Sequence, residues 1–256
     1  MHAMKQGVRG TPVIDRMLRS MKPLILVLLI GAAGLPGQEF PRYEIKRARG
    51  PIVVDGKMDD AAWRGAKKAD KFHFNWYQSG AKEKTEARLL WDDTNLYVGY
   101  RCQDKHISAK VVERHGPVSL DDCVEIFLRP DPDKRSYYGF EMNVIGTMLN
   151  FVRADWWKGG RYWEPEGVQL RTSHHGLPGK EESPDDNGWV LEVAIPFKNF
   201  VNDAKHTPPQ QGDVWRINLN RSGGKTDAQY STWSPVKTPK PNFHQPDSFG
   251  YVTFVQ

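Results

Sequence analysis

Cysteine is nearly absent, with two residues in a chain of 256. Export to an oxidising compartment would favour a disulfide between Cys102 and Cys123. The apolar alternation argues against it, because Cys102 lies in phase with Val98 whereas Cys123 lies out of phase with Val124. At most one of the two side chains should therefore point into a core. We expect two separate thiols, and a Cys102–Cys123 bridge stays the alternative.

A strong excess of charge is also missing beyond the first 37 residues. The formal net charge is +5, and residues 1–37 carry +4 of it, from Lys5, Arg9, Arg16, Arg19 and Lys22 against Asp15. The remaining chain is close to neutral, so it lacks the electrostatic footprint of a protein that binds nucleic acid or an anionic membrane. We expect neither partner.

Long apolar runs are lacking, apart from residues 24–30. That run follows basic residues and precedes the small residues 31–34, and it is shorter than the roughly 20 residues that span a bilayer. The order is typical of a secretory signal peptide, with Met17 or Met21 as an alternative start. We predict that residues 1–37 are cleaved, and that residues 38–256 form one domain that is secreted or periplasmic.

Helical periodicity is absent after position 40, and apolar alternation with period two takes its place. The clearest predicted strands are 85–91, 96–103, 122–128, 138–143, 189–195, 214–220 and 250–254, and the weaker ones are 43–48, 52–54, 72–76, 148–153 and 168–172. Turn signals such as Asp55-Gly56 separate them. Many short strands predict an all-β fold, specifically a two-sheet antiparallel β-sandwich of immunoglobulin-like or jelly-roll-like type.

Several catalytic and metal patterns are missing as well. The sequence shows no nucleophile elbow, phosphate loop or catalytic triad. His174 and His175 have no third ligand at metal-binding spacing, so a solvated pair is expected. In residues 55–63, a turn should lead into one helical turn capped by Asp59, which would bury Trp63.

Five segments carry a resemblance to a known family. They are PIVVDGKMDDAAW (51–63), ARLLWDDTNLYVGYRCQD (87–104), DDCVEIFLRPD (121–131), GWVLEVAIPF (188–197) and DSFGYVTF (247–254). In this order they resemble the family 9 carbohydrate-binding modules, which occur attached to xylanases and as stand-alone exported proteins. Residues 137–150 look like the stand-alone branch. The resemblance implies non-catalytic binding of a polysaccharide or oligosaccharide, in support of extracellular or periplasmic carbohydrate catabolism, with glycoside hydrolases of the same pathway as partners.

The resemblance also implies site residues. Glu125 alternates against Val124 and Ile126, so it faces solvent or a groove, and the matching glutamate of the family accepts hydrogen bonds from sugar hydroxyls. Asn143 matches an asparagine whose amide both donates and accepts. Glu141 stands where the sugar-binding members carry an arginine, so the charge of that strand is reversed.

Two tryptophans sandwich the sugar in the resembled family, and neither is kept here. The first position falls near Val118 or Ser119, and the second matches Phe243, which can still stack on a sugar ring. Trp156 and Trp157, in the Gly-containing loop 154–165, are the candidates for the second wall.

Three alternatives remain open. Glu125 and Glu141 could form the carboxylate pair of a glycosidase. Met142 or Met148 with a loop histidine could ligate a b-type haem. Family members also use structural calcium, for which the acidic candidates, without an assigned ligand set, are Asp59, Asp60, Asp92, Asp93, Asp121 and Asp122. No other cofactor is expected.

Overall fold

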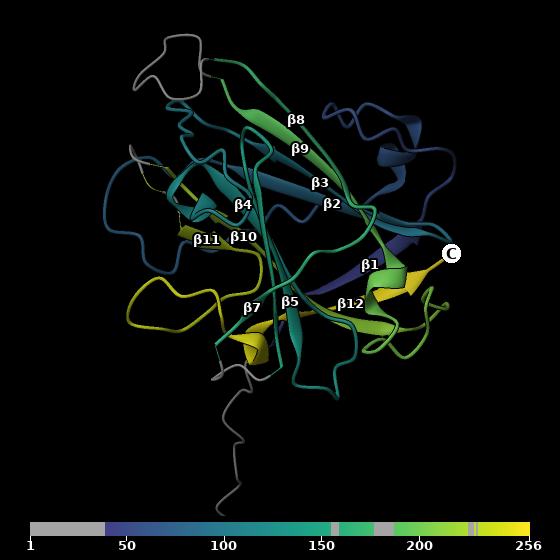
Figure 1. Ribbon diagram of the computed structural model, residues 1–256. Coiled ribbons are helices and arrows are strands. Elements are labelled where there is room, and N and C mark those ends of the chain that lie inside the picture. The colour runs from purple at the N-terminus through teal and green to yellow at the C-terminus, as the bar shows by residue number, and fades with distance from the viewer. Residues whose placement is uncertain (1–38, 155–158, 177–186, 225–227, 229) are drawn as a thin grey trace, which may run out of the picture. The chain divides into compact units, whose positions relative to one another are not determined.

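The computed structural model describes residues 39–154, 159–176, 187–224, 228 and 230–256 (Figure 1). Residues 39–256 form one compact unit. Its strands are β1 Arg42–Arg47, β2 Thr85–Trp91, β3 Asn95–Cys102, β4 Cys123–Arg129, β5 Tyr137–Asn143, β6 Met148–Arg153, β7 Arg161–Tyr162, β8 Gln169–His174, β9 Trp189–Pro196, β10 Val214–Ser222, β11 Tyr230–Thr232 and β12 Gly250–Val255. Four short 3-10 helices are η1 Ala61–Gly65, η2 Val118–Leu120, η3 Phe197–Phe200 and η4 Pro246–Ser248. Among the described residues, no helix is long and apolar enough to cross a bilayer.

The strands form one curled sheet in the order β7-β6-β5-β4-β10-β12-β1-β2-β3-β9-β8, with β11 on β10. The all-β prediction is confirmed. The prediction of a strictly antiparallel arrangement is wrong at β1, which pairs parallel with both β12 and β2. Through these two pairings β1 joins the two halves of the sheet. A parallel pair needs a long connection, and residues 48–84 provide it between β1 and β2.

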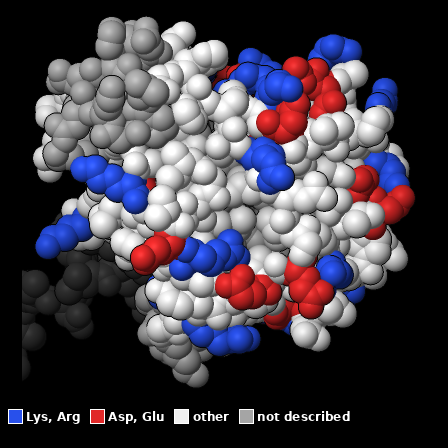
Figure 2. Space-filling view, turned by 45° about the horizontal axis from the view of Figure 1, so that its top comes forward, with Lys and Arg blue, Asp and Glu red and all other residues white. Residues whose placement is uncertain are grey.

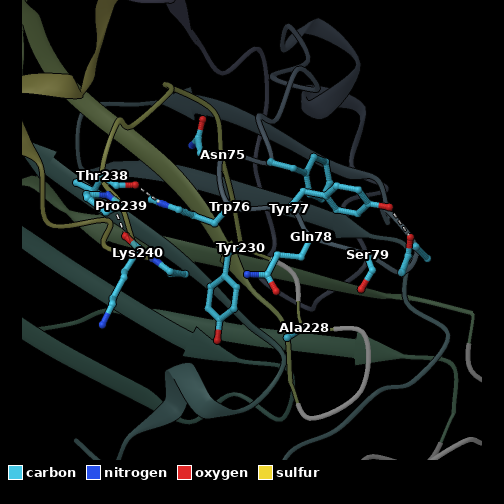
Figure 3. Close-up of a pocket in the computed structure, with 14 residues that line it drawn as sticks. Asn75, Trp76, Tyr77, Gln78, Ser79, Ala228, Tyr230, Thr238, Pro239 and Lys240 are labelled. Carbon is cyan, nitrogen blue, oxygen red and sulfur yellow. Dashed lines mark hydrogen bonds between the residues drawn. The ribbon is translucent and has the colours of Figure 1, made fainter.

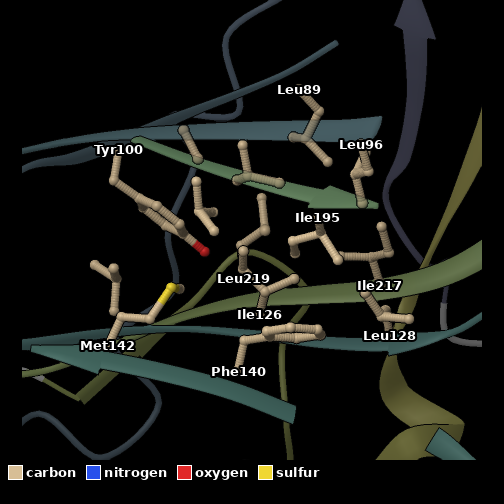
Figure 4. Close-up of a cluster of buried hydrophobic side chains, with 14 of the residues drawn as sticks. Leu89, Leu96, Tyr100, Ile126, Leu128, Phe140, Met142, Ile195, Ile217 and Leu219 are labelled. Atoms are coloured by element: carbon tan, nitrogen blue, oxygen red, sulfur yellow. The ribbon is translucent and has the colours of Figure 1, made fainter. Parts of the chain in front are cut away.

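The main core lies between the two halves of the curled sheet (Figure 4). Its side chains come from β2, β3 and β9 on one side and from β4, β5 and β10 on the other, among them Leu89, Leu96, Ile195, Ile126, Phe140 and Leu219. Cys102 belongs to this core, whereas Cys123 lies on the opposite face of β4, and both thiols are free and buried. The parity argument is therefore confirmed, and the alternative of a bridge is wrong.

Most predicted strands match the structure to within two residues, and 85–91 and 148–153 match at both ends. Segment 52–54 is not a strand, and 72–76 holds only an isolated bridge between His73 and Thr232. The strands β7 and β11 were not predicted, because two or three residues are too few to show an alternation.

Glu192 on β9 fixes the turn before η1. This carboxylate is 1% exposed, and it accepts the indole N–H of Trp63 at 2.9 Å and the backbone N–H of Gly56 at 2.7 Å. Trp63 is buried as predicted. The predicted cap is wrong, because η1 begins after Asp60, whose carboxylate accepts the N–H of Val53 rather than capping the helix.

Replacing Glu192 by glutamine is expected to lower the free energy of unfolding by about 1 to 3 kcal/mol. The glutamine side chain has an NH₂ group in place of one carboxylate oxygen, so one of the N–H groups that donate to Glu192 loses its acceptor. Chemical denaturation measures the change. The exposed Glu166, which pairs with Lys198 at the surface, is the control, and Glu166→Gln should change stability by less than about 0.5 kcal/mol. Equal effects of the two substitutions would contradict this role of Glu192.

Candidate functional site

The half-sheet of β6, β5, β4 and β10 has a second face, opposite the main core. On β4 the alternation sends Val124 and Ile126 into the core and leaves Glu125 and Phe127 on this second face. The register places Glu141 of β5 on one side of Glu125 and Asn220 of β10 on the other. The two carboxyl-bearing residues are therefore direct cross-strand neighbours.

Both carboxyl groups are buried. Glu125 is 2% exposed and accepts the Ser222 hydroxyl at 2.9 Å and the Asn220 amide at 3.5 Å. Burial, reinforced by the charge of Glu141, raises the pKa of Glu125 well above its ordinary value. Burial also raises the pKa of Glu141 to about 7, against the opposing effect of Arg153. The side chain oxygen of Asn220 is buried without a hydrogen-bond partner among the described residues.

Aromatic rings cover the neighbouring part of this face. Phe127, Tyr137 and Phe243 belong to one buried cluster, and the ring of His244 stacks on Phe127 with centroids 5.0 Å apart. The Tyr137 hydroxyl lies 2.9 Å from His244 Nδ1. Burial, with a smaller effect of Arg153, lowers the pKa of His244 to about 4, so the imidazole is neutral at pH 7 and its Nδ1 can accept a hydrogen bond from the Tyr137 hydroxyl.

A pocket of about 730 Å³ opens beside this cluster (Figure 3). It is lined by residues 74–81, Ala228, Tyr230 and residues 238–241. Tyr77 is 45% and Tyr230 is 37% exposed, so both present ring surface to solvent. The indole N–H of Trp76 donates to the Thr238 carbonyl at 2.7 Å and ties the two lining segments together. Partly exposed rings with polar groups around them suit a ligand with apolar C–H faces and hydroxyl edges.

Tyr230 connects the pocket to the buried carboxyl pair. Its register partner on β10 is Ser222, whose hydroxyl donates to Glu125. On its other side, the Tyr230 ring lies 6.5 Å from that of Phe243, which in turn lies 5.5 Å from Trp76. One continuous set of contacts thus runs from the open rings to the deepest acidic groups.

The structure places the predicted site residues as follows. Glu125 and Glu141 come together, and Phe243 adjoins the pocket, but it is only 8% exposed because Trp76 and Tyr230 cover it. Trp156 and Trp157 lie outside the described residues, so their role stays a prediction.

Asn143 is fully buried, and protein groups occupy its amide. The Nδ2 group donates to the Val111 carbonyl at 2.8 Å and to Asp121 at 2.9 Å, and the oxygen accepts the N–H of Thr147 at 2.7 Å. A sugar would have to break these bonds, so Asn143 supports the loop in this structure. Its binding role stays an untested prediction.

Sequence reasoning missed Tyr230, Tyr77 and Trp76. The signal that was present is the run of alternating aromatic and polar residues at 72–77, which was assigned to a weak strand. Tyr230 gave no signal, because its strand β11 has only three residues and shows no alternation.

Among the described residues, no three His, Cys, Asp or Glu side chains gather at a metal-binding distance. The oxygens of Asp121 and Asp122 accept backbone N–H groups, as in the bonds from Val111 and Gly224. Calcium stays an untested prediction. Met142 and Met148 pack in the main core, and this packing gives the haem alternative no support.

An all-β domain with an open aromatic pocket beside buried polar groups is typical of carbohydrate-binding modules. Residues 59–254 match the profile of carbohydrate-binding family 9, and the chain belongs to that family. Membership assigns carbohydrate binding to this domain.

Two enzymes of known sequence match part of this chain. The chain is 28% identical over 153 residues to the exoglucanase XynX of Acetivibrio thermocellus, and 28% identical over 165 residues to the endo-1,4-beta-xylanase C of Paenibacillus barcinonensis. These matches cover 59% and 61% of the chain but only 12% and 13% of the two enzymes.

Two solved structures share the fold. A Bacteroides uniformis protein, provisionally described as carbohydrate-binding, has a TM-score of 0.72 at 22% identity, over 84% of this chain and 100% of the other. A family 9 module from Caldicellulosiruptor kristjanssonii in complex with cellotriose has a TM-score of 0.58 at 17% identity, over 84% of this chain and 94% of the other.

Proposed function

We propose that this protein binds a glucose- or xylose-based oligosaccharide non-covalently in the pocket at Tyr77 and Tyr230. The observation that carries the proposal is the open aromatic pocket in a domain of carbohydrate-binding family 9. The Tyr230 ring provides a stacking surface, and the side chains of Asn75 and Gln78 offer hydrogen bonds to hydroxyl groups. The cellotriose complex of the related module supports a β-glucan type of ligand.

The sandwich arrangement predicted from the sequence, in which two layers enclose one core, suits a module that presents its loops to an extended ligand. Residues 1–37 would direct export, so the protein acts outside the cell or in the periplasm. There it would support glycoside hydrolases such as those whose modules it resembles.

The protein is proposed to change no bond in the sugar. Glycoside hydrolysis needs one ionised carboxylate and one acid on either side of an accessible bond, with room for water. Glu125 and Glu141 are instead both nearly inaccessible, with pKa values raised by burial. Purified protein is expected to release no reducing sugar from xylan or cellulose. Release that disappears in both Glu125→Gln and Glu141→Gln would establish the glycosidase alternative.

The substitution Tyr230→Ala tests the binding site. We expect it to weaken the affinity for cellotriose or xylotriose by about 1 to 2 kcal/mol, since the lost stacking resembles the loss of an aromatic contact and its buried area. Titration calorimetry measures the affinity. Tyr162→Ala is the matched control, because Tyr162 is 64% exposed and lies on β7, at the far end of this half of the sheet. Unchanged affinity in Tyr230→Ala would place the sugar elsewhere.

A further inference from the structure

A second pocket, of about 300 Å³, lies between the start of β1, residues 67–73 and Trp233. Its lining includes four cationic side chains, those of Arg42, Lys67, Lys68 and Lys71. His73 also lines it. Asp70 is the single acidic residue in the lining. We call it the basic pocket.

This excess of positive charge is local. Beyond residue 37 the chain is close to neutral, and the face drawn in Figure 2 shows acidic and basic side chains interspersed. Within the basic pocket, Lys68 is neutralised by Glu86 at 2.7 Å. Lys67 and Lys71 form no ion pair with any residue that the structure describes, and Arg42 lies over the Tyr251 ring, 4.9 Å from its centre. The free charges therefore favour an anionic group.

The floor of the basic pocket is aromatic and rigid. Tyr43 and Trp233 meet edge to face with centroids 6.3 Å apart, and the Tyr43 hydroxyl is bonded to the Lys67 carbonyl. Trp233 is 6% exposed and packs in the main core.

The basic pocket shares its segments with the sugar pocket. Residues 67–71 and 73 line the former and residues 74–81 the latter, and the bridge between His73 and Thr232 lies where the two sets meet. On the other segment, Tyr230 lines the sugar pocket and Trp233 the basic pocket. Tyr230 and Trp233 are three residues apart, and three residues of extended chain span about 10 Å. The two pockets are therefore separated by a distance of that order.

We infer that the basic pocket binds the carboxylate of an acidic sugar, such as a uronic acid unit or side group of a polysaccharide. The choice of a sugar as the carrier of the carboxylate rests on the proposed function. Lys67 and Lys71 supply the positive charge that pairs with the carboxylate. The protein thereby prefers acidic over neutral glycans.

The test compares trigalacturonic acid with cellotriose by calorimetry on the whole mature chain. The double variant Lys67→Gln/Lys71→Gln is expected to weaken trigalacturonate binding about tenfold, from the loss of two partly exposed ion pairs, and to leave cellotriose binding unchanged. Its control is Lys105→Gln/Lys110→Gln, which removes the same charge from exposed positions outside both pockets. This control should alter neither affinity by more than about twofold, because salt screens distant charges.

The outcomes separate the two proposals. If cellotriose binds and trigalacturonate binding is equal in the double variant and the wild type, the basic pocket has no role and the inference is overturned. If acetate at the same concentration displaces trigalacturonate, the pocket is a general anion site and the inference is again overturned. If trigalacturonate binding depends on Lys67 and Lys71 while cellotriose does not bind at all, the inference stands and the proposed sugar pocket fails.

Discussion

Replacing Arg221 by methionine is expected to lower the free energy of unfolding by about 3 to 5 kcal/mol, because it leaves buried acidic groups without their counter-charge. Arg221 is 0% exposed and lies on the core side of β10. Its guanidinium donates to Asp104 at 3.0 Å, to Glu83 at 3.3 Å and to the Gln103 carbonyl at 2.7 Å. Urea denaturation followed by tryptophan fluorescence measures the loss.

Two controls separate burial from charge in this experiment. Arg47, which pairs with the exposed Asp93, is the surface control, and Arg47→Met should cost no more than about 1 kcal/mol. The triple variant Arg221→Met/Asp104→Asn/Glu83→Gln removes all three charges and should recover part of the lost stability. If Arg221→Met costs no more than Arg47→Met, the buried cluster does not stabilise the fold.

The sequence predicts well the features that depend on local alternation. The bounds of β2, the separation of Cys102 from Cys123 and the position of Glu125 off the main core all follow from the two-residue period of a strand. Each of these needs only the identities of neighbours along the chain, which the sequence states directly.

Features that depend on distant pairing could not be predicted in this way. The parallel pairing of β1 joins it to residues of β2 that lie more than forty positions away in the sequence. Tyr230 takes its position from β11, a strand of only three residues. The burial of Phe243 follows from Trp76, which lies far from it in sequence. A family pattern indicates where a binding residue stands in the fold. Its neighbours in this chain decide whether its ring or amide remains accessible to a ligand.

Stability is expected to fall as the pH rises from about 4 to 7, owing to buried carboxyl groups. Burial raises the pKa of Glu141 to about 7 and that of Glu125 well above its ordinary value, and burial with the nearby Asp104 raises the pKa of Asp122 to about 7. Between the ordinary and the raised pKa, the folded state binds more protons than the unfolded state, so unfolding becomes easier as the pH rises. His244 acts oppositely, because its pKa of about 4 lies below the ordinary value and stability is regained between about pH 4 and 6.5. Three carboxyl groups should outweigh one imidazole.

The double variant Glu125→Gln/Glu141→Gln isolates the pair on the second sheet face. At pH 8 it should be more stable than the wild type by about 3 kcal/mol, because each unit of pKa shift corresponds to about 1.4 kcal/mol and a glutamine needs no proton to stay neutral. The glutamine oxygen at position 125 can still accept the Ser222 hydroxyl, so the local packing is kept. At pH 4.5 the two proteins should differ little, since both carboxyl groups are then protonated in the folded state. Denaturation at a series of pH values gives the comparison, and Glu44→Gln, on the exposed face of β1, is the control. If the pH dependence of the double variant equals that of the wild type, the pair titrates near its ordinary pKa and is open to water.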